Sequence, residues 1–177
     1  MKKIMIIGSC GAGKSTLALK LQQITGLELI HLDQYYWKAG WVESDKTVWQ
    51  TQVEKLAQKP SWIIDGNYGG TMDIRLAAAD TIIYLDRSRW VSLYRVLKRI
   101  VQYYGKTRPD LAEGCHERFN WPFIHYVFTF NDRKKPKLLR RLKDLKPHQQ
   151  LFILRSNRAV KSFLKTMVLQ QTSLPKK

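Results

Sequence analysis

Short apolar runs rich in β-branched residues alternate along this chain with longer segments of helical periodicity. The apolar runs predict strands over residues 3–7, 27–32, 62–65, 81–86 and 151–154. Helical patterns cover residues 14–25, 45–58, 89–104, 136–146 and 157–169. This alternation is typical of a three-layer α/β fold, in which helices cover both faces of a mostly parallel sheet.

One segment interrupts the alternation. Residues 105–136 contain Gly105, Pro109, Gly114 and Pro122 together with several arginines. We expect these residues, called the lid segment below, to form a mobile, basic, helical lid over one end of the sheet. The 177 residues then form a single domain over 1–170, followed by a C-terminal tail at 171–177.

The cysteines and the apolar runs indicate a cellular compartment. Cys10 and Cys115 are far apart and form neither a metal-ligand cluster nor a disulfide framework. No apolar run approaches the roughly 20 residues that cross a bilayer. The opening MKKIMIIG leads directly into GAGKST rather than into a signal-peptide cleavage site. We therefore expect a cytoplasmic protein with no membrane partner; the sequence predicts no oligomeric state.

Positive charge is concentrated in the second half of the chain. Residues 1–87 hold 10 Lys+Arg and 9 Asp+Glu, whereas residues 88–177 hold 21 and 5, within a total net charge of +17. This asymmetry indicates an anionic partner such as a nucleotide, a phosphorylated substrate or a nucleic acid. A solvated basic surface that only aids solubility is the alternative, and charge alone does not choose between them.

The strongest local signal is a glycine-rich loop between the first strand and the first helix. Its sequence G-S-C-G-A-G-K-S matches the P-loop pattern G-x-x-x-x-G-K-[ST]. Glycines let several backbone N–H groups face phosphates, and the helix N-terminus favours negative charge. Lys14 can reach the β- and γ-phosphates, the Ser15 hydroxyl can ligate Mg²⁺, and Thr16 could contact the α-phosphate. We therefore predict an ATP site formed by Gly8, Ser9, Cys10, Gly11, Ala12, Gly13, Lys14, Ser15 and Thr16.

Several classes of P-loop protein are disfavoured. The chain has no N-K-x-D guanine-reading loop, no L-S-G-G-Q segment, and no hydrophobic strand ending in Asp-Glu. What remains resembles the adenylate-kinase-like group of small P-loop kinases, in which W-I-I-D-G matches the third strand. In such a fold that strand lies beside the P-loop strand, so Asp65 would face Mg²⁺. The alternative for Asp65 and Gly66 is an ordinary turn after a strand.

Two further acidic residues end predicted strands. Asp33 closes the second strand, and the carboxyl ends of parallel strands border the ligand crevice. A carboxylate there can accept a proton from an attacking hydroxyl or hold the acceptor in line, unless it only caps the following turn. We interpret His31 as filling space in the sheet. For Asp86, which stands beside Arg87 and Arg89, we favour a structural ion pair or a helix cap.

A more particular resemblance covers nearly the whole chain. The segments G-S-C-G-A-G-K-S-T, H-L-D-Q-Y-Y-W-K-A-G-W, W-I-I-D-G-N-Y, Y-L-D-R-S-R and G-C-H-E-R-F resemble one bacterial family, the "DNA topology modulation protein" family. The resemblance implies an ATP-binding, kinase-like fold with strand order 2-3-1-4-5. It implies no substrate, because the family label describes an effect on DNA rather than a reaction.

The acceptor side departs from nucleoside-monophosphate kinases. Their D-G-F-P-R becomes D-G-N-Y-G here, and no arginine precedes Arg75. Arginine is the natural bidentate partner of phosphate, so its loss argues against a standard monophosphate acceptor. Tyr36 and Trp37 belong to an aromatic cluster that could stack on a base or sugar, or could fill a gap in the core. We take Tyr36, Trp37 and Arg75 as candidate acceptor contacts.

Arginines are also expected around the transferred phosphate, where positive charge speeds phosphoryl transfer. Arg99 ends a predicted helix near the lid segment and Arg108 lies within it, so these two are the preferred catalytic arginines beside Lys14 and Asp33. Surface solvation is the alternative for each arginine. Arg155 follows the last strand and could clamp the adenine.

Three functions fit these features. The first is a kinase that uses ATP and Mg²⁺ to phosphorylate a small molecule, either nucleoside-like or a hydroxylated metabolite. The second is a nucleic-acid-directed protein, such as a polynucleotide kinase or an ATP-dependent DNA-binding factor, to which the basic run R-K-K-P-K points. The third is a nucleotide-dependent regulator without an acceptor.

Overall fold

The computed structural model describes residues 1–172, and its central feature is a parallel sheet. The strands are β1 (Lys3–Gly8), β2 (Leu29–His31), β5 (Trp62–Asp65), β6 (Thr81–Leu85) and β7 (Gln150–Leu154). Their order across the five-stranded sheet is β2-β5-β1-β6-β7, with every neighbouring pair parallel. This is the predicted order 2-3-1-4-5 of the five expected strands, so the predicted α/β fold class is confirmed.

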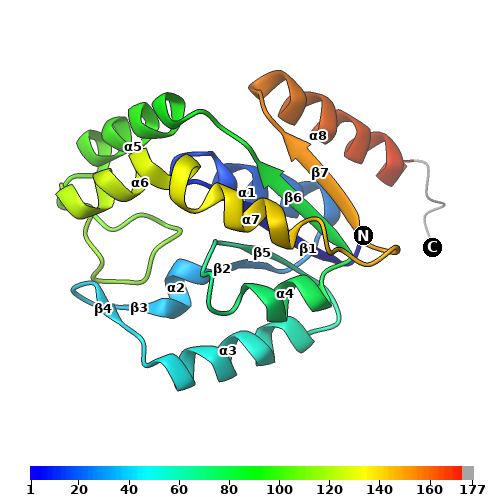
Figure 1. Cartoon of the computed structure of the whole chain (residues 1–177), viewed down its shortest axis with the longest axis horizontal. Helices are drawn as coiled ribbons and strands as arrows, with labels where there is room; N and C mark the ends of the chain where they lie inside the picture. Colours follow the sequence, from blue (N-terminus) through cyan, green and yellow to red (C-terminus); the bar gives the residue numbers. More distant parts are fainter. Residues whose placement is uncertain (173–177) are drawn as a thin grey trace.

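Helices surround this sheet (Figure 1). Their bounds are α1 (Lys14–Thr25), α2 (Leu32–Tyr36), α3 (Lys46–Gln58), α4 (Met72–Ala78), α5 (Arg89–Tyr103), α6 (Trp121–Arg133), α7 (Lys135–Arg141) and α8 (Asn157–Thr172). A small antiparallel hairpin of β3 (Trp37–Lys38) and β4 (Val42–Glu43) follows α2. None of the helices within residues 1–172 combines the length and apolar character needed to cross a bilayer.

The two faces of the sheet have separate hydrophobic cores because side chains alternate along each strand. On β1, Ile4 and Ile6 join Leu17 and Leu21 of α1 and Phe163 of α8. The intervening residues of β1 face the opposite layer, where helices α3, α4 and α7 supply the partners. That second core includes Met5, Ile7, Trp49, Val53, Leu76 and Leu138. The four β1 side chains from Ile4 to Ile7 are 0% exposed, as expected for the central strand of a three-layer molecule.

The lid segment contains more regular structure than its composition predicts. Residues 104–120, called the lid loop below, are irregular, but residues 121–133 form helix α6, which packs on α5 through Val96, Ile100, Ile124 and Val127. Asn120 caps α6 by accepting a hydrogen bond from the Phe123 N–H, and Pro122 lies in the first turn, where proline is tolerated. The mobility of the lid segment stays a prediction.

Other boundaries differ from expectation by a few residues. Helix α7 ends at Arg141 rather than at 146, before a turn region that contains Asp144 and Pro147. The last helix runs to Thr172, and residues 173–177 of the expected tail lie outside the described part of the chain.

Candidate active site

The P-loop connects β1 to α1 and needs glycine for steric reasons. Gly8, Gly11 and Gly13 have positive φ angles of 148°, 78° and 98°. A Cβ on Gly11 would lie 2.3 Å from the Ser92 carbonyl oxygen, and one on Gly8 would lie 2.7 Å from that of Leu85. The backbone of the loop therefore packs directly against β6 and α5. Only glycine allows this close approach.

The loop presents groups suited to a phosphate chain. Helix α1 begins at Lys14 after Gly13, and no side chain caps its first N–H groups. The Lys14 ammonium donates a hydrogen bond to the Ser9 carbonyl at 3.2 Å and lines a large cavity. Cys10 also lines that cavity. Uncapped N–H groups at a helix N-terminus, together with a lysine, form an anion site.

Two side chains that the sequence analysis did not select hold this loop in place. Asn67 accepts a hydrogen bond from the Gly8 N–H at 3.1 Å and donates one to the Gly8 carbonyl at 2.7 Å. Arg95 donates to the Ala12 carbonyl at 3.2 Å and to Asn157 at 3.0 Å. Asn67 comes directly after Asp65-Gly66, so the D-G-N segment does more than end a strand. The D-G-N-Y match was the signal that could have identified it.

Asp65 ends β5 beside β1 and is held by His31. The two residues are register partners on β5 and β2, and His31 Nδ1 lies 2.8 Å from Asp65 Oδ1. Burial lowers the pKa of His31, but the hydrogen bond to Asp65 and the charges of Asp65, Asp110 and Asp33 outweigh it and raise the pKa. His31 therefore orients Asp65, and the interpretation of His31 as a space-filling residue was wrong.

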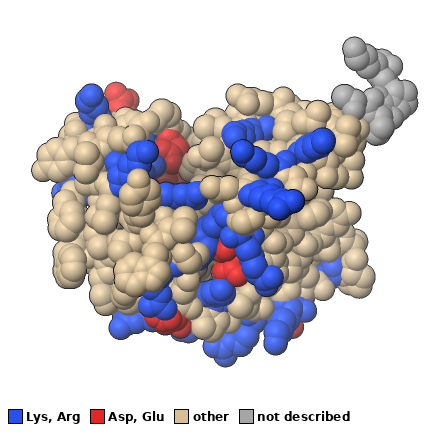
Figure 2. Space-filling model, turned by 90° about the horizontal axis from the view of Figure 1, so that it is seen from above, with Lys and Arg blue, Asp and Glu red and all other residues tan. Residues whose placement is uncertain are grey.

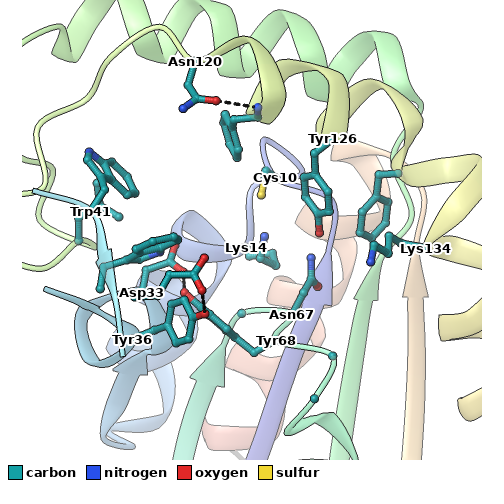
Figure 3. A pocket seen from close by; sticks show the side chains of 18 of the residues that line it. Cys10, Lys14, Asp33, Tyr36, Trp41, Asn67, Tyr68, Asn120, Tyr126 and Lys134 are labelled. Atoms are coloured by element: carbon teal, nitrogen blue, oxygen red, sulfur yellow. Dashed lines mark hydrogen bonds between the residues drawn. The ribbon is translucent and has the colours of Figure 1, made fainter. Parts of the chain in front are cut away.

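Asp33 lines the cavity and accepts a hydrogen bond from the Tyr68 hydroxyl. Burial raises the pKa of the Asp33 carboxyl, while the Tyr68 hydrogen bond and the Lys14 charge oppose that rise. Burial and the Asp33 charge raise the pKa of Tyr68, so Tyr68 stays a donor. Lys14 and Asp33 face the same cavity, with Tyr68 behind the carboxylate (Figure 3). Asp33 therefore does more than cap a turn.

Ser15 and Asp65 were predicted to ligate Mg²⁺. Among residues 1–172, no three His, Cys, Asp or Glu side chains converge to hold a metal ion by themselves. Magnesium in phosphoryl-transfer sites takes one or two protein oxygens and completes its shell with phosphates and water. A serine hydroxyl and one buried carboxylate fit that donor set. The Ser15 hydroxyl donates to Asp110 of the lid loop at 2.8 Å, so Mg²⁺ binding requires this partner to move or to join.

The two predicted catalytic arginines meet at one buried acid. Arg99 from α5 and Arg108 from the lid loop both approach Glu117, which is 3% exposed. Their Nε atoms form ion pairs with Glu117 Oε2 at 3.2 and 2.8 Å, and Arg99 Nη2 also donates a hydrogen bond to Glu117 Oε1 at 3.3 Å. Arg108 also contacts Asp110 at 3.0 Å. Both guanidinium groups line the cavity.

The lid loop lies beside the β3–β4 hairpin (Figure 1), and residues of both segments line the cavity. The Gly40 N–H donates to the Gly114 carbonyl at 3.0 Å, and Trp41 Nε1 donates to the His116 carbonyl at 2.8 Å. Gln34 donates to the Pro109 carbonyl at 2.7 Å. These hydrogen bonds therefore join two segments that lie about 75 residues apart in sequence, beside the site.

The cavity has a volume of about 1020 Å³. Tyr36, Trp37 and Trp41 line one wall, as expected for acceptor contacts. Tyr36 also packs against the core residue Trp49, with ring centroids 5.1 Å apart, and its hydroxyl donates to Glu43 at 2.9 Å. The aromatic cluster therefore belongs both to the cavity wall and to the core. The sequence analysis left open whether the cluster contacts a ligand or fills a gap in the core. Its cavity side fits the first alternative and its core side fits the second.

Arg75 does not line the cavity. Its side chain is 0% exposed and donates to the carbonyls of Gly66, Asn67 and Tyr68 at 2.8, 2.6 and 3.0 Å. Burial lowers the pKa of Arg75 to about 9, so it stays cationic at neutral pH. The geometry gives Arg75 a structural task in the β5–α4 loop, in place of the expected acceptor contact.

The region expected to hold the adenine is more open. Arg155 is 77% exposed in its side chain, and its Nε lies 3.6 Å from Asp86. Lys135 also pairs with Asp86, at 2.7 Å. Asp86 is therefore a structural ion-pair residue, but its partners come from distant elements rather than from Arg87 and Arg89. Ser88, not Asp86, caps α5.

Comparison with solved structures gives the fold. The chain is similar to shikimate kinase from Acinetobacter baumannii in complex with shikimate, with a TM-score of 0.57, 15% identity, and coverage of 100% of this chain and 96% of that chain. It is also similar to a gluconokinase from Sinorhizobium meliloti 1021 (TM-score 0.53, 13% identity, 97% and 91% covered). Deoxyadenosine kinase from M. mycoides with bound dATP gives a TM-score of 0.51 at 19% identity, with 94% and 99% covered.

The chain has the fold of the P-loop kinases. Identities below 20% limit these likenesses to the fold itself. No protein-family model matches the sequence, and no curated protein matches it.

Proposed function

We propose that this protein is a kinase that transfers the γ-phosphate of ATP to a hydroxyl of a small molecule bound in the cavity. One observation carries the proposal: Lys14 of the P-loop, Asp33, and the arginines Arg99 and Arg108 all line one cavity. They supply the kinds of group that phosphoryl transfer uses: a phosphate-binding lysine, a carboxylate for the acceptor, and two cations for the transferred phosphate.

Each group has a task in the transfer. The loop from Gly8 to Thr16 binds the phosphates, and Asp65 and Ser15 are the protein oxygens available to Mg²⁺, which neutralises phosphate charge when bound. Asp33, held by Tyr68, orients the acceptor hydroxyl and accepts its proton. The guanidinium groups of Arg99 and Arg108, which pair with Glu117 in this structure, can bind oxygens of the transferred phosphate when that pairing opens. Arg155, exposed beside Asp86, is the nearest candidate contact for the nucleotide base.

Binding of ATP is tested first, through thermal stability. A ligand present at about 100 times its Kd stabilises the folded state by about 2.7 kcal/mol, which raises the Tm of a chain of this size by about 5–10 °C. We expect this shift with ATP and Mg²⁺ in the wild type and its loss in Lys14→Ala. An equal shift in that variant would overturn the P-loop assignment.

Transfer is tested with γ-labelled ATP and a panel of nucleosides, monophosphates, sugars, sugar acids and 5′-hydroxyl oligonucleotides. We expect label on one small-molecule class in the wild type and no label with Lys14→Ala. Asp33→Asn should keep the ATP-induced Tm shift and lose transfer by about 100-fold or more, the usual contribution of a general base. Release of label only as inorganic phosphate would instead favour a nucleotide-dependent regulator. Label on the oligonucleotides would favour the nucleic-acid-directed alternative.

A further inference from the structure

Three cationic side chains from one helix face line the cavity. Lys134 is the N-cap residue of α7, Lys137 and Arg141 lie in the middle and at the end of that helix, and all three line the cavity wall. Their i, i+3, i+7 spacing places them on one side of the helix. Leu138 between them packs into the core and fixes the orientation of α7. None of the three was selected from the sequence, where Lys134 and Lys137 were only part of the basic run R-K-K-P-K.

The charges of these residues are not balanced inside the cavity. Among the described residues, no carboxylate lies within ion-pair distance of Lys134 or Lys137, and Arg141 pairs only with the exposed Asp73, at 3.1 Å. The acids that line the cavity have other partners: Asp33 binds Tyr68, Glu43 binds Tyr36, and Glu117 lies between two arginines. The α7 wall therefore carries positive charge that no acid of the cavity neutralises.

Open space faces this wall. The β5–α4 loop opposite α7 contains Gly69 and Gly70, and Arg141 donates to the Gly69 carbonyl at 3.1 Å. A Cβ on Gly70 would meet nothing within 4 Å, and one on Gly69 would meet only Arg141, at 3.9 Å. A small anion can therefore approach both the loop backbone and the cations of α7.

The arrangement across the cavity separates two chemical environments. In Figure 3, Asp33 and the aromatic residues Tyr36 and Trp41 lie on one side, Lys134 lies on the other, and Lys14 lies between them. A molecule whose hydroxyl is oriented by Asp33 next to Lys14 would extend its remaining groups either along the aromatic wall or toward α7. An anionic group on such a molecule finds its neutralising partners on α7.

We infer that Lys134, Lys137 and Arg141 form an anion subsite for the phosphate acceptor, called the α7 subsite here. The acceptor is then a hydroxylated compound that also carries a carboxylate or a phosphate, rather than a neutral nucleoside or sugar. Lysines supply point charges and Arg141 supplies a planar fork, which together accept either oxyanion. This inference rests on the proposed function for the identity of its ligand as an acceptor, but the subsite itself can be tested without transfer.

The first test measures anion binding directly. A non-hydrolysable ATP analogue with Mg²⁺ occupies the P-loop, and inorganic phosphate or acetate is titrated against chloride at matched ionic strength while Tm is recorded. We expect phosphate, acetate or both to raise the Tm of the wild type more than chloride does. The anion that raises Tm indicates whether the subsite accepts a phosphate or a carboxylate. The Lys134→Gln/Lys137→Gln double variant should lose this difference. Arg140→Gln, an exposed neighbour on the same helix that does not line the cavity, should keep it.

Equal shifts in the double variant, or no anion-specific shift in the wild type, would overturn the subsite. Lys134 and Lys137 are exposed, so the double variant is expected to fold normally. Its Tm without added anion provides that check.

The second test uses transfer and separates the two proposals. With paired acceptors that differ only in the anionic group, we expect the anionic member to be preferred. The double variant should raise its KM about 10–100-fold, the value of one or two lost charged hydrogen bonds, with kcat and the KM for ATP little changed. Transfer that prefers the neutral member would overturn the α7 subsite and leave the kinase intact. Absence of transfer to every acceptor, with anion binding retained, would overturn the kinase and leave the subsite.

Discussion

Asp33 is the residue whose protonation decides whether the proposed transfer can proceed, because only the ionised carboxylate accepts a proton. Burial raises its pKa, and the Tyr68 hydroxyl lowers it by donating to the charged form. Tyr68→Phe removes that donor, so the pKa of Asp33 rises further. We predict that the acidic limb of the kcat/KM profile moves to higher pH in Tyr68→Phe.

The chain offers a matched control for this measurement. Tyr84 also donates to a carboxylate, Asp86, at 3.2 Å, and neither residue lines the cavity. Tyr84→Phe should leave the acidic limb in place. A limb that is identical in Tyr68→Phe and the wild type would show that Asp33 is not the group that titrates.

His31 makes a second pH-dependent contribution, in this case to stability. Its pKa is raised above 6.5 in the folded protein, so folding favours the protonated imidazole. The stabilisation is fully present below the unfolded value and is lost as pH rises through the folded value. His31→Gln can keep a neutral hydrogen bond to Asp65 but cannot be charged. We predict that urea denaturation shows a larger stability difference between wild type and His31→Gln at about pH 5.5 than at about pH 9. A difference that stays constant or grows with pH would contradict the charged His31–Asp65 pair.

At the scale of elements, the β5–α4 loop depends on one buried cation. Arg75, which is itself 0% exposed, donates to three successive carbonyls of residues 66–68. A buried acceptor left without its donor costs about 1–3 kcal/mol, so Arg75→Met, which removes three such donors, should lower Tm by about 6 °C or more. The exposed Arg140→Met should change stability by less than about 0.5 kcal/mol. A raised acceptor KM in Arg75→Met at unchanged Tm would restore the acceptor role expected from the sequence.

The elements and residues of this chain show what sequence patterns can predict. The parallel sheet and its order were predictable because β-branched runs and the P-loop motif are local signals whose arrangement the fold class constrains. The placement of Lys14 and Asp33 at one cavity was predictable because Lys14 lies in the P-loop motif and Asp33 at a predicted strand end, while their roles stay predictions. Arg75 was assigned wrongly because a sequence does not show burial, and burial turns a phosphate-binding side chain into a structural one.

The residues that the sequence analysis did not select were missed for a different reason. Asp110 contacts Ser15 across 95 positions, and Glu117 meets Arg99 from within a loop that has no periodicity. Pro122 was counted among the residues that interrupt the alternation, although proline is tolerated in a first turn and α6 begins at Trp121. Contacts of this kind depend on how the lid loop folds back over the hairpin, which no local pattern encodes.

At the scale of the whole molecule, only some of the basic residues behind the net charge of +17 line the cavity. Lys and Arg side chains lie at several places on the face in Figure 2, with few acidic residues among them. Some of the basic half is neutralised internally, as in the Arg89–Asp132 and Lys135–Asp86 pairs. We expect the remainder to attract polyanions through charge alone.

We expect polyanion binding at this surface to be independent of nucleotide binding in the cavity. The salt dependence of duplex binding tests this. Polyanion binding through phosphate contacts weakens with a slope of about −0.9 per neutralised phosphate on B-DNA, so the fluorescence anisotropy of a labelled duplex should show binding at about 50 mM salt and a steep loss by about 200 mM. The surface lysines and arginines supply these contacts, whereas Lys14 lies in the cavity. We therefore predict the same affinity and salt slope in Lys14→Ala and the wild type, with or without ATP. An affinity that ATP changes in the wild type but not in Lys14→Ala would couple the duplex to the P-loop. The nucleic-acid-directed function would then replace the small-molecule kinase as the better account of the basic half.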